Sequence, residues 1–203
     1  MDLENHPPPS RFIAAVDVRS ARFLPAQPPF IRRSRARGRY AVGVRYEREV
    51  QEYLALFALG RPGLEHRAGP WLEFCDKRGK RWCQPDALLL DHEQKTGIIY
   101  EVKYQHTADA WWQLHWLYLP VLRVALPHYV LGLVEVVRWY DPSVAFPERH
   151  DLTKNVGEVP NAKRIAVHIF NPKRANRFPI HGSVDSAHDR KEAGGQGPAE
   201  GAE

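Results

Sequence analysis

The chain has 203 residues, of which 43% are hydrophobic and 26% charged, proportions that are ordinary for a globular protein. This length allows one domain with a sizeable core, or at most two small domains. Two cysteines exclude a disulfide scaffold and favour a reducing, cytoplasmic location. The most apolar window, residues 114–137, contains prolines, histidines and charged residues, so we expect no membrane-spanning segment.

The net charge of +5 is spread unevenly. Residues 183–203 contain five carboxylates and two cations, so this stretch carries −3 and the remainder +8. A basic body favours a polyanionic partner, most often nucleic acid. The densest basic cluster consists of Arg32, Arg33, Arg35, Arg37 and Arg39. Such a cluster can neutralise phosphates or enter a minor groove, and the alternative is a solvated linker.

Composition divides the chain into three parts. Residues 1–38 are rich in proline and arginine and are expected to form an extended basic arm, with a short strand at Phe12–Val18. Residues 39–180 are expected to form the folded domain. Residues 181–203 are small and polar and predict a disordered tail.

The folded part begins with a predicted helix over Tyr40–Leu59, where apolar side chains recur at helical spacing. The pattern next predicts a hairpin, with a strand over Trp71–Phe74, a charged turn near Gly79 and a return strand from Trp82 through Ala87–Leu90. A strand over Gly97–Gln105 and an apolar helix over Ala108–Leu126 with a possible kink at Pro120 follow. The last predicted strands are Tyr129–Trp139 and Arg164–Phe170. The order α-β-β-β-α-β indicates an α/β fold with a mixed sheet flanked by helices.

The strand over Gly97–Gln105 is the most informative segment. Strand side chains alternate between faces, so Glu101, Lys103 and Gln105 should project opposite an apolar face. An ordinary solvated Glu–Lys pair is the alternative. Fifteen residues upstream, Asp86 follows Pro85 and can meet Glu101 from a neighbouring strand, although it could also be a simple turn residue. Two such carboxylates repel unless a cation lies between them, and oxygen ligands suit Mg²⁺ or Mn²⁺.

A third carboxylate is expected from the first helix. Glu47 lies three residues before Val50 and seven before Leu54, so it borders the stripe that faces the core. Glu49 points more towards solvent, and we therefore prefer Glu47 without excluding Glu49. Ordinary surface charge on an amphipathic helix is the alternative.

These motifs, in this order, resemble the PD-(D/E)xK nuclease superfamily with its restriction-endonuclease-like core. The resemblance covers roughly residues 40–140 and rests on the phrases Gly43-x-x-x-Glu47-Arg48-Glu49-Val50, Pro85-Asp86 and Glu101-Val102-Lys103. The hairpin that ends in Pro-Asp is similar to that of transposon end-cleaving endonuclease subunits and phage endonucleases. The helix phrase is similar to that of archaeal Holliday-junction resolvases.

The resemblance implies a role for each matching position. Asp86 and Glu101 would bind the metal ion with the carbonyl of Val102, and Glu47 would complete the shell directly or through water. Lys103 would position or help to deprotonate the attacking water and steady the charge on the phosphate. A metal supplies both a nucleophilic hydroxide and charge neutralisation, which phosphodiester hydrolysis needs.

Other residues near this constellation fit the resemblance less closely. RecB-type members of the superfamily carry Gln and Tyr four residues apart on the following helix, whereas Gln113 and Tyr118 are five apart. Gln105 and His106 could each contact a phosphate or a metal-bound water.

The sequence therefore predicts a metal-dependent DNA endonuclease that leaves 5′-phosphate products, in recombination, transposition or mobile-element processing. The alternative is a catalytically inactive nucleic-acid-binding or assembly subunit on the same fold. Expected partners are DNA and either a second copy of the chain or a recombinase or transposase. The residues do not distinguish DNA from RNA.

Overall fold

The structure, a computed structural model, describes residues 15–31, 38–140, 148–149, 151–152, 158–160 and 164–172. Its elements are β1 (Ser20–Phe23), α1 (Arg39–Leu59), β2 (Leu64–Ala68), β3 (Leu72–Asp76), β4 (Gly79–Cys83), β5 (Ala87–Asp91), β6 (Thr96–Gln105), α2 (Ala108–Trp112), the π-helix η2 (Gln113–Tyr118), α3 (Leu119–Ala125), β7 (Val130–Trp139), β8 (Glu148–Arg149) and β9 (Ile165–Ile169). The predicted α/β class, a mixed sheet with flanking helices, is confirmed.

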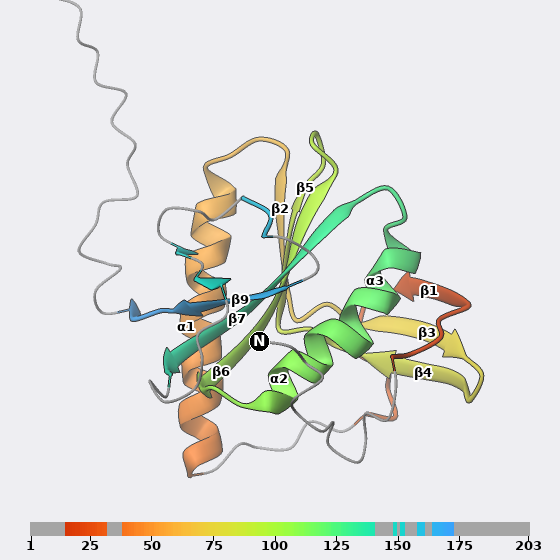
Figure 1. The fold of residues 1–203 in the computed structure, drawn as a ribbon, viewed down its shortest axis with the longest axis horizontal. Coiled ribbons are helices and arrows are strands. Elements are labelled where there is room, and N and C mark those ends of the chain that lie inside the picture. Colours follow the sequence, from red (N-terminus) through yellow and green to blue (C-terminus); the bar gives the residue numbers. More distant parts are fainter. Residues whose placement is uncertain are drawn as a thin grey trace, which may run out of the picture.

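A six-stranded sheet organises the molecule, with strand order β2-β5-β6-β7-β9-β8. The pairs β2–β5 and β5–β6 are antiparallel, whereas β6–β7, β7–β9 and β9–β8 are parallel. Parallel neighbours need a crossover connection, which α2, η2 and α3 supply between β6 and β7. These crossover helices and α1 lie on different faces of the sheet (Figure 1).

Helix α1 covers one face because its apolar side chains repeat at a spacing of four residues. Tyr46, Val50 and Leu54 are each at most 2% exposed and pack in one cluster with Tyr100 and Val102 of β6. Burying a large apolar side chain contributes roughly 1.5–3 kcal/mol, so this stripe fixes α1 on the sheet. The helix predicted over residues 40–59 is confirmed and begins one residue earlier.

The second face is covered by the crossover helices, and a small antiparallel sheet of order β1-β3-β4 packs beside α3. Trp111, Leu114 and Leu122 share a buried cluster with Leu72 and Phe74 of β3. Figure 1 shows the small sheet projecting beside α3. The β3–β4 hairpin is the outer part of that projection.

The N-terminal stretch differs from its prediction. Residues 15–18 form no strand and β1 starts at Ser20, whereas positions 12–14 of the expected strand lie outside the described residues. The described part of the expected arm packs on the body: the Val16 N–H donates to the Trp116 carbonyl at 3.0 Å. Val16 and Val18 contact the buried cluster, which explains why this stretch is ordered.

The return strand predicted from Trp82 through Leu90 is wrong as one element. Strand β4 ends at Cys83 and β5 begins at Ala87, and the two belong to different sheets. Pro85 interrupts them because it has no N–H to donate to a sheet. Besides β6, the strand that pairs with β5 is β2, a polar edge strand (LEHRA) that apolar alternation does not reveal.

The predicted apolar helix over residues 108–126 contains a π-helical segment rather than a simple kink. The Leu119 N–H donates to the Leu114 carbonyl five residues back, and Pro120 follows at once. Proline cannot donate to the preceding turn and its ring crowds it, so a widened turn before Pro120 relieves the clash. No helix within the described ranges is long and apolar enough to span a membrane.

Candidate active site

A hydrogen bond holds Asp86 beside β6, the strand that carries Glu101. Pairing of Ala87 with Tyr100 places Asp86 one step further along, next to Glu101. The backbone N–H of Val102 donates to Oδ2 of Asp86 at 2.6 Å. The Pro85-Asp86 connection therefore reaches β6 through a charge-assisted hydrogen bond, which is stronger than a neutral one.

Glu101 and Lys103 project from β6 on the face that the crossover helices cover. Glu101 is 1% exposed, and its Oε1 pairs with the ammonium group of Lys103. Its Oε2 is buried without a hydrogen-bond partner among the described residues. A buried carboxylate oxygen is costly without a donor, and the Tyr118 hydroxyl of η2 is a described group that interacts with the Glu101 carboxylate.

Glu47 joins the cluster from α1 through Gln51. The Gln51 side-chain amide donates to Glu47 Oε1 at 3.1 Å and to the backbone carbonyl of Asp86 at 2.8 Å. The charges of Asp86 and Lys103 also act on Glu47. The charge of Glu49 instead contributes to the raised pKa of Tyr46, so of the two predicted alternatives Glu47 is the one beside Asp86.

Electrostatics within the cluster disfavour three ionised carboxylates. Burial, then the Asp86 carboxylate, raises the pKa of Glu101 to about 8, although Lys103 opposes the shift. Burial and Asp86 likewise raise the pKa of Glu47 to about 7, and burial raises that of Asp86. Burial lowers the pKa of Lys103, but the three carboxylates outweigh it and the net pKa is raised. One ammonium group thus faces three carboxylates.

The cluster fits a hard divalent cation in donor chemistry and charge. Carboxylate oxygens are the ligands that Mg²⁺ and Mn²⁺ prefer, and Glu101 Oε2 has no other partner among the residues described. If all three acids ionise, two negative charges remain uncompensated by Lys103. The described ranges contain no three His, Cys, Asp or Glu side chains already grouped as metal ligands. The donor types therefore suit such an ion, but the described side chains are not placed as a set of three metal ligands.

Tyr118 borders the cluster from η2. Its hydroxyl donates to the Gln84 carbonyl at 3.1 Å. Burial raises the pKa of Tyr118 well above its ordinary value, and the Glu101 and Asp86 carboxylates add to the shift. Because π-helical bonds link residues five apart, Gln113 and Tyr118 lie one turn apart despite their five-residue spacing. Gln113 Oε1 is buried without a hydrogen-bond partner in the described part.

A fourth carboxylate, Glu135 on β7, lies opposite Glu101 in the parallel β6–β7 pair. It is fully buried and accepts from His106 Nδ1 at 2.7 Å, from Trp111 Nε1 at 2.5 Å and from the Thr107 N–H at 3.4 Å. Sequence reasoning missed Glu135 and Gln51. The signal for Glu135 is a lone carboxylate inside the apolar run LGLVEVV, whereas no pattern marks Gln51.

The remaining predicted site residues lie apart from the cluster or outside the description. Gln105 is exposed at the end of β6 and has no hydrogen bond to the three carboxylates in the described structure. Arg32, Arg33, Arg35 and Arg37 lie outside the described residues, as does the side chain of Arg39, whose backbone begins α1.

The chain matches no protein-family model, no curated protein and no solved structure. The geometry of the cluster is therefore the basis for its functional interpretation.

Proposed function

We propose that this chain is a metal-dependent DNA endonuclease of the PD-(D/E)xK type that hydrolyses phosphodiester bonds. One observation supports this most directly. Glu47, Asp86 and Glu101 come from separate elements and interact around Lys103, while a buried oxygen of Glu101 has no partner among the described residues. Three buried or half-buried acids that share one ammonium group are costly for stability, which supports a role in binding a cation.

In this proposal Asp86, Glu101 and Glu47 hold Mg²⁺ or Mn²⁺, with the carbonyl of Val102 as a further oxygen ligand. The bound ion would supply a water that ionises near neutral pH and a Lewis acid for the phosphate. The hydrogen bond from the Val102 N–H orients the Asp86 carboxylate, because it occupies Oδ2. Gln51 holds Glu47 and the Asp86 backbone in one arrangement.

Lys103 supplies the fixed positive charge. Its side chain is 30% exposed, so the ammonium group can contact a phosphate while its ion pair with Glu101 fixes its orientation. A fixed cation beside the phosphate stabilises the charge that develops in the transition state. The expected products carry 5′-phosphate and 3′-hydroxyl ends.

One observation favours a second function, that of a catalytically inactive nucleic-acid-binding subunit on the same fold. The described carboxylates are not grouped as a ready set of metal ligands. A decayed site could retain acidic side chains without ever binding the ion.

Cleavage of supercoiled plasmid distinguishes the two functions. We expect nicking with Mg²⁺ or Mn²⁺ and none with EDTA. Asp86→Asn and Lys103→Met should each reduce the rate about 10²–10⁴-fold and leave DNA binding in place. Glu47→Gln should impair cutting, whereas the matched control Glu49→Gln should not. Wild-type protein that binds DNA but never cuts supports the inactive subunit.

The biological setting is a further part of the proposal. Comparing linear duplexes, four-way junctions and transposon-like ends tests a role in recombination, transposition or mobile-element processing. Cleavage of both strands would favour a homodimer or a recombinase or transposase partner. The free thiols of Cys75 and Cys83 agree with the reducing cytoplasm that the sequence predicts.

A further inference from the structure

The proposed site is acidic, so the affinity for a DNA backbone has to come from elsewhere. Within the described residues, the β3–β4 hairpin is the element that joins a dense group of cations directly to this site. Its tip has the sequence DKRGKR, with Lys77, Arg78 and Lys80 exposed. Strand β4 then leads through Gln84 and Pro85 into Asp86.

Buried Asp76 fixes the shape of the tip. Its Oδ1 accepts the Arg78 N–H at 2.8 Å, and its Oδ2 accepts from the Arg81 guanidinium at 2.9 Å. The Asp76 side chain is 5% exposed, whereas its partner Arg81 is 39% exposed at the surface of the hairpin. Gly79 completes the turn with a φ of 98°, which favours glycine. The hydrogen bonds of Asp76 therefore fix the backbone of the turn that carries the tip cations.

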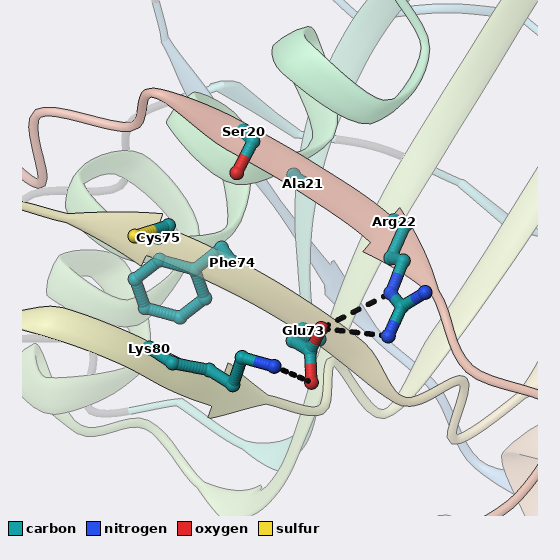
Figure 2. Close-up of a pocket in the computed structure, with 7 residues that line it drawn as sticks. All are labelled: Ser20, Ala21, Arg22, Glu73, Phe74, Cys75 and Lys80. Carbon is teal, nitrogen blue, oxygen red and sulfur yellow. Dashed lines mark hydrogen bonds and ion pairs between the residues drawn. The ribbon is translucent and has the colours of Figure 1, made fainter.

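Only part of this positive charge is compensated. On the outer face of the small sheet, Glu73 lies between Arg22 and Lys80 and pairs with both (Figure 2). These three side chains line a hollow of about 150 Å³, where the single carboxylate of Glu73 compensates one of the two positive charges. Arg81 is paired with Asp76, whereas Lys77 and Arg78 form no ion pair with any described residue. The free charge is therefore concentrated at the tip.

The base of the hairpin also contacts the N-terminal stretch through an aromatic pair. The rings of Phe30 and Trp82 contact edge to face at a centroid distance of 4.6 Å. Strand β4 thus connects the basic tip to the Pro85-Asp86 connection.

We propose that the tip of the β3–β4 hairpin is a docking wing for duplex DNA, in which Lys77 and Arg78 contact backbone phosphates. This inference rests on the proposed function. Seven residues separate Gly79 from Asp86, and because the chain leaves β4 after Cys83, the two lie at most roughly 23 Å apart at the rise of a strand. That upper limit corresponds to about seven base pairs at 3.4 Å each, so the wing contacts phosphates within about that distance of the cleaved bond.

The test is the salt dependence of binding to a 30-base-pair duplex in EDTA, where no cleavage occurs. The double variant Lys77→Ala/Arg78→Ala should reduce the slope of log K against log salt by about 2. Affinity at 0.1 M salt should fall roughly tenfold for each lost contact. An unchanged slope would contradict the proposal that Lys77 and Arg78 contact backbone phosphates.

A matched control removes two charges at the opposite end of the sheet. Arg61 and Lys95 are exposed and lie at the end joined by the hydrogen bond from the His92 N–H to the Gly63 carbonyl. Arg61→Gln/Lys95→Asn should leave the slope unchanged, and Asn suits the positive φ of Lys95. An equal loss in both double variants would mean that general charge, not the hairpin, drives binding. Thermal melting of each variant shows whether it is folded.

This measurement separates the wing from the nuclease proposal. If wild type binds with a tip-dependent slope but never cuts, the wing stands and the nuclease proposal fails. If wild type cuts and the tip variant binds normally, the wing alone fails. Where cutting occurs, flanks shorter than about seven base pairs on one side should slow wild type and not the tip variant.

Discussion

Glu101 and Glu135 occupy the same register position on neighbouring parallel strands, and both are buried. Their surroundings are opposite. Glu135 accepts from two side chains and one backbone N–H, so both of its oxygens have a donor. Glu101 has one oxygen without a partner among the described residues and a pKa raised to about 8. Glu135 is therefore satisfied by donors within the core. Glu101 instead shares the single ammonium group of Lys103 with Asp86 and Glu47.

Removing the charge of Glu101 should stabilise the metal-free protein at alkaline pH. A carboxyl whose pKa rises from 4.5 unfolded to about 8 folded binds its proton more tightly in the folded state. Its contribution to the free energy of unfolding is complete below pH 4.5 and is lost as the pH rises towards 8. Glu101→Gln should remove that loss, with a gain at pH 8.5 on the order of a few kcal/mol.

Urea unfolding of both proteins in EDTA between pH 5 and pH 8.5 measures this difference. Burial lowers the pKa of His66 and of His115, so these groups act in the opposite direction in both proteins and cancel in the comparison. A constant difference across that range would mean that Glu101 ionises normally in the folded protein.

The matched substitution Glu135→Gln should have the opposite sign. A glutamine amide can replace one acceptor oxygen but turns its NH₂ towards a donor from His106, Thr107 or Trp111. Leaving such buried donors unpaired should reduce the free energy of unfolding by roughly 1–3 kcal/mol. The same urea experiment at pH 8 detects it. A stabilising effect at both positions would contradict the distinction between the two carboxylates.

Divalent cations should raise the melting temperature of the wild-type protein. A ligand present at 100 times its Kd adds about 2.7 kcal/mol, which corresponds to roughly 5–10 °C for a chain of this size. The rise should be larger at pH 8 than at pH 5, because protonated Glu101 and Glu47 bind the ion poorly. Asp86→Asn/Glu101→Gln should abolish it, and an equal rise in that variant would place the ion elsewhere.

Gln51 should act as a positioning residue. Its amide connects Glu47 to the Asp86 carbonyl, so Gln51→Leu should weaken ion binding and cleavage about 10–100-fold. Mn²⁺ binding, measured by the enhancement of water proton relaxation, detects the change independently of activity. Its exposed neighbour provides the control, since Glu52→Gln should leave ion affinity unchanged. Equal effects of both substitutions would indicate a general helix defect.

Much of the cluster follows from local patterns in the sequence. The alternation of a strand put Glu101 and Lys103 on one face, and in the structure the two side chains form an ion pair. Helical spacing put Glu47 at the border of the buried stripe, where it meets Asp86. These placements needed only the period of each element and the order of the elements along the chain.

Contacts between distant elements escaped the same reasoning. Gln51 is defined by the approach of α1 to the end of β4–β5, which no periodicity encodes. Strand β2 was missed because an edge strand of five partly exposed residues needs no apolar alternation. The N-terminal stretch looked like a free arm, yet β1 finds its partner in β3, fifty residues later.

The widened turn of η2 also bears on how this chain should be compared with others. Such turns arise naturally when one amino acid is added within a regular helix. Removing one residue between Gln113 and Tyr118 would rotate Tyr118 by about 100° relative to Gln113. An alignment that forbids a single-residue gap here would shift every later position by one. Relatives with an ordinary helix at this point would then be overlooked.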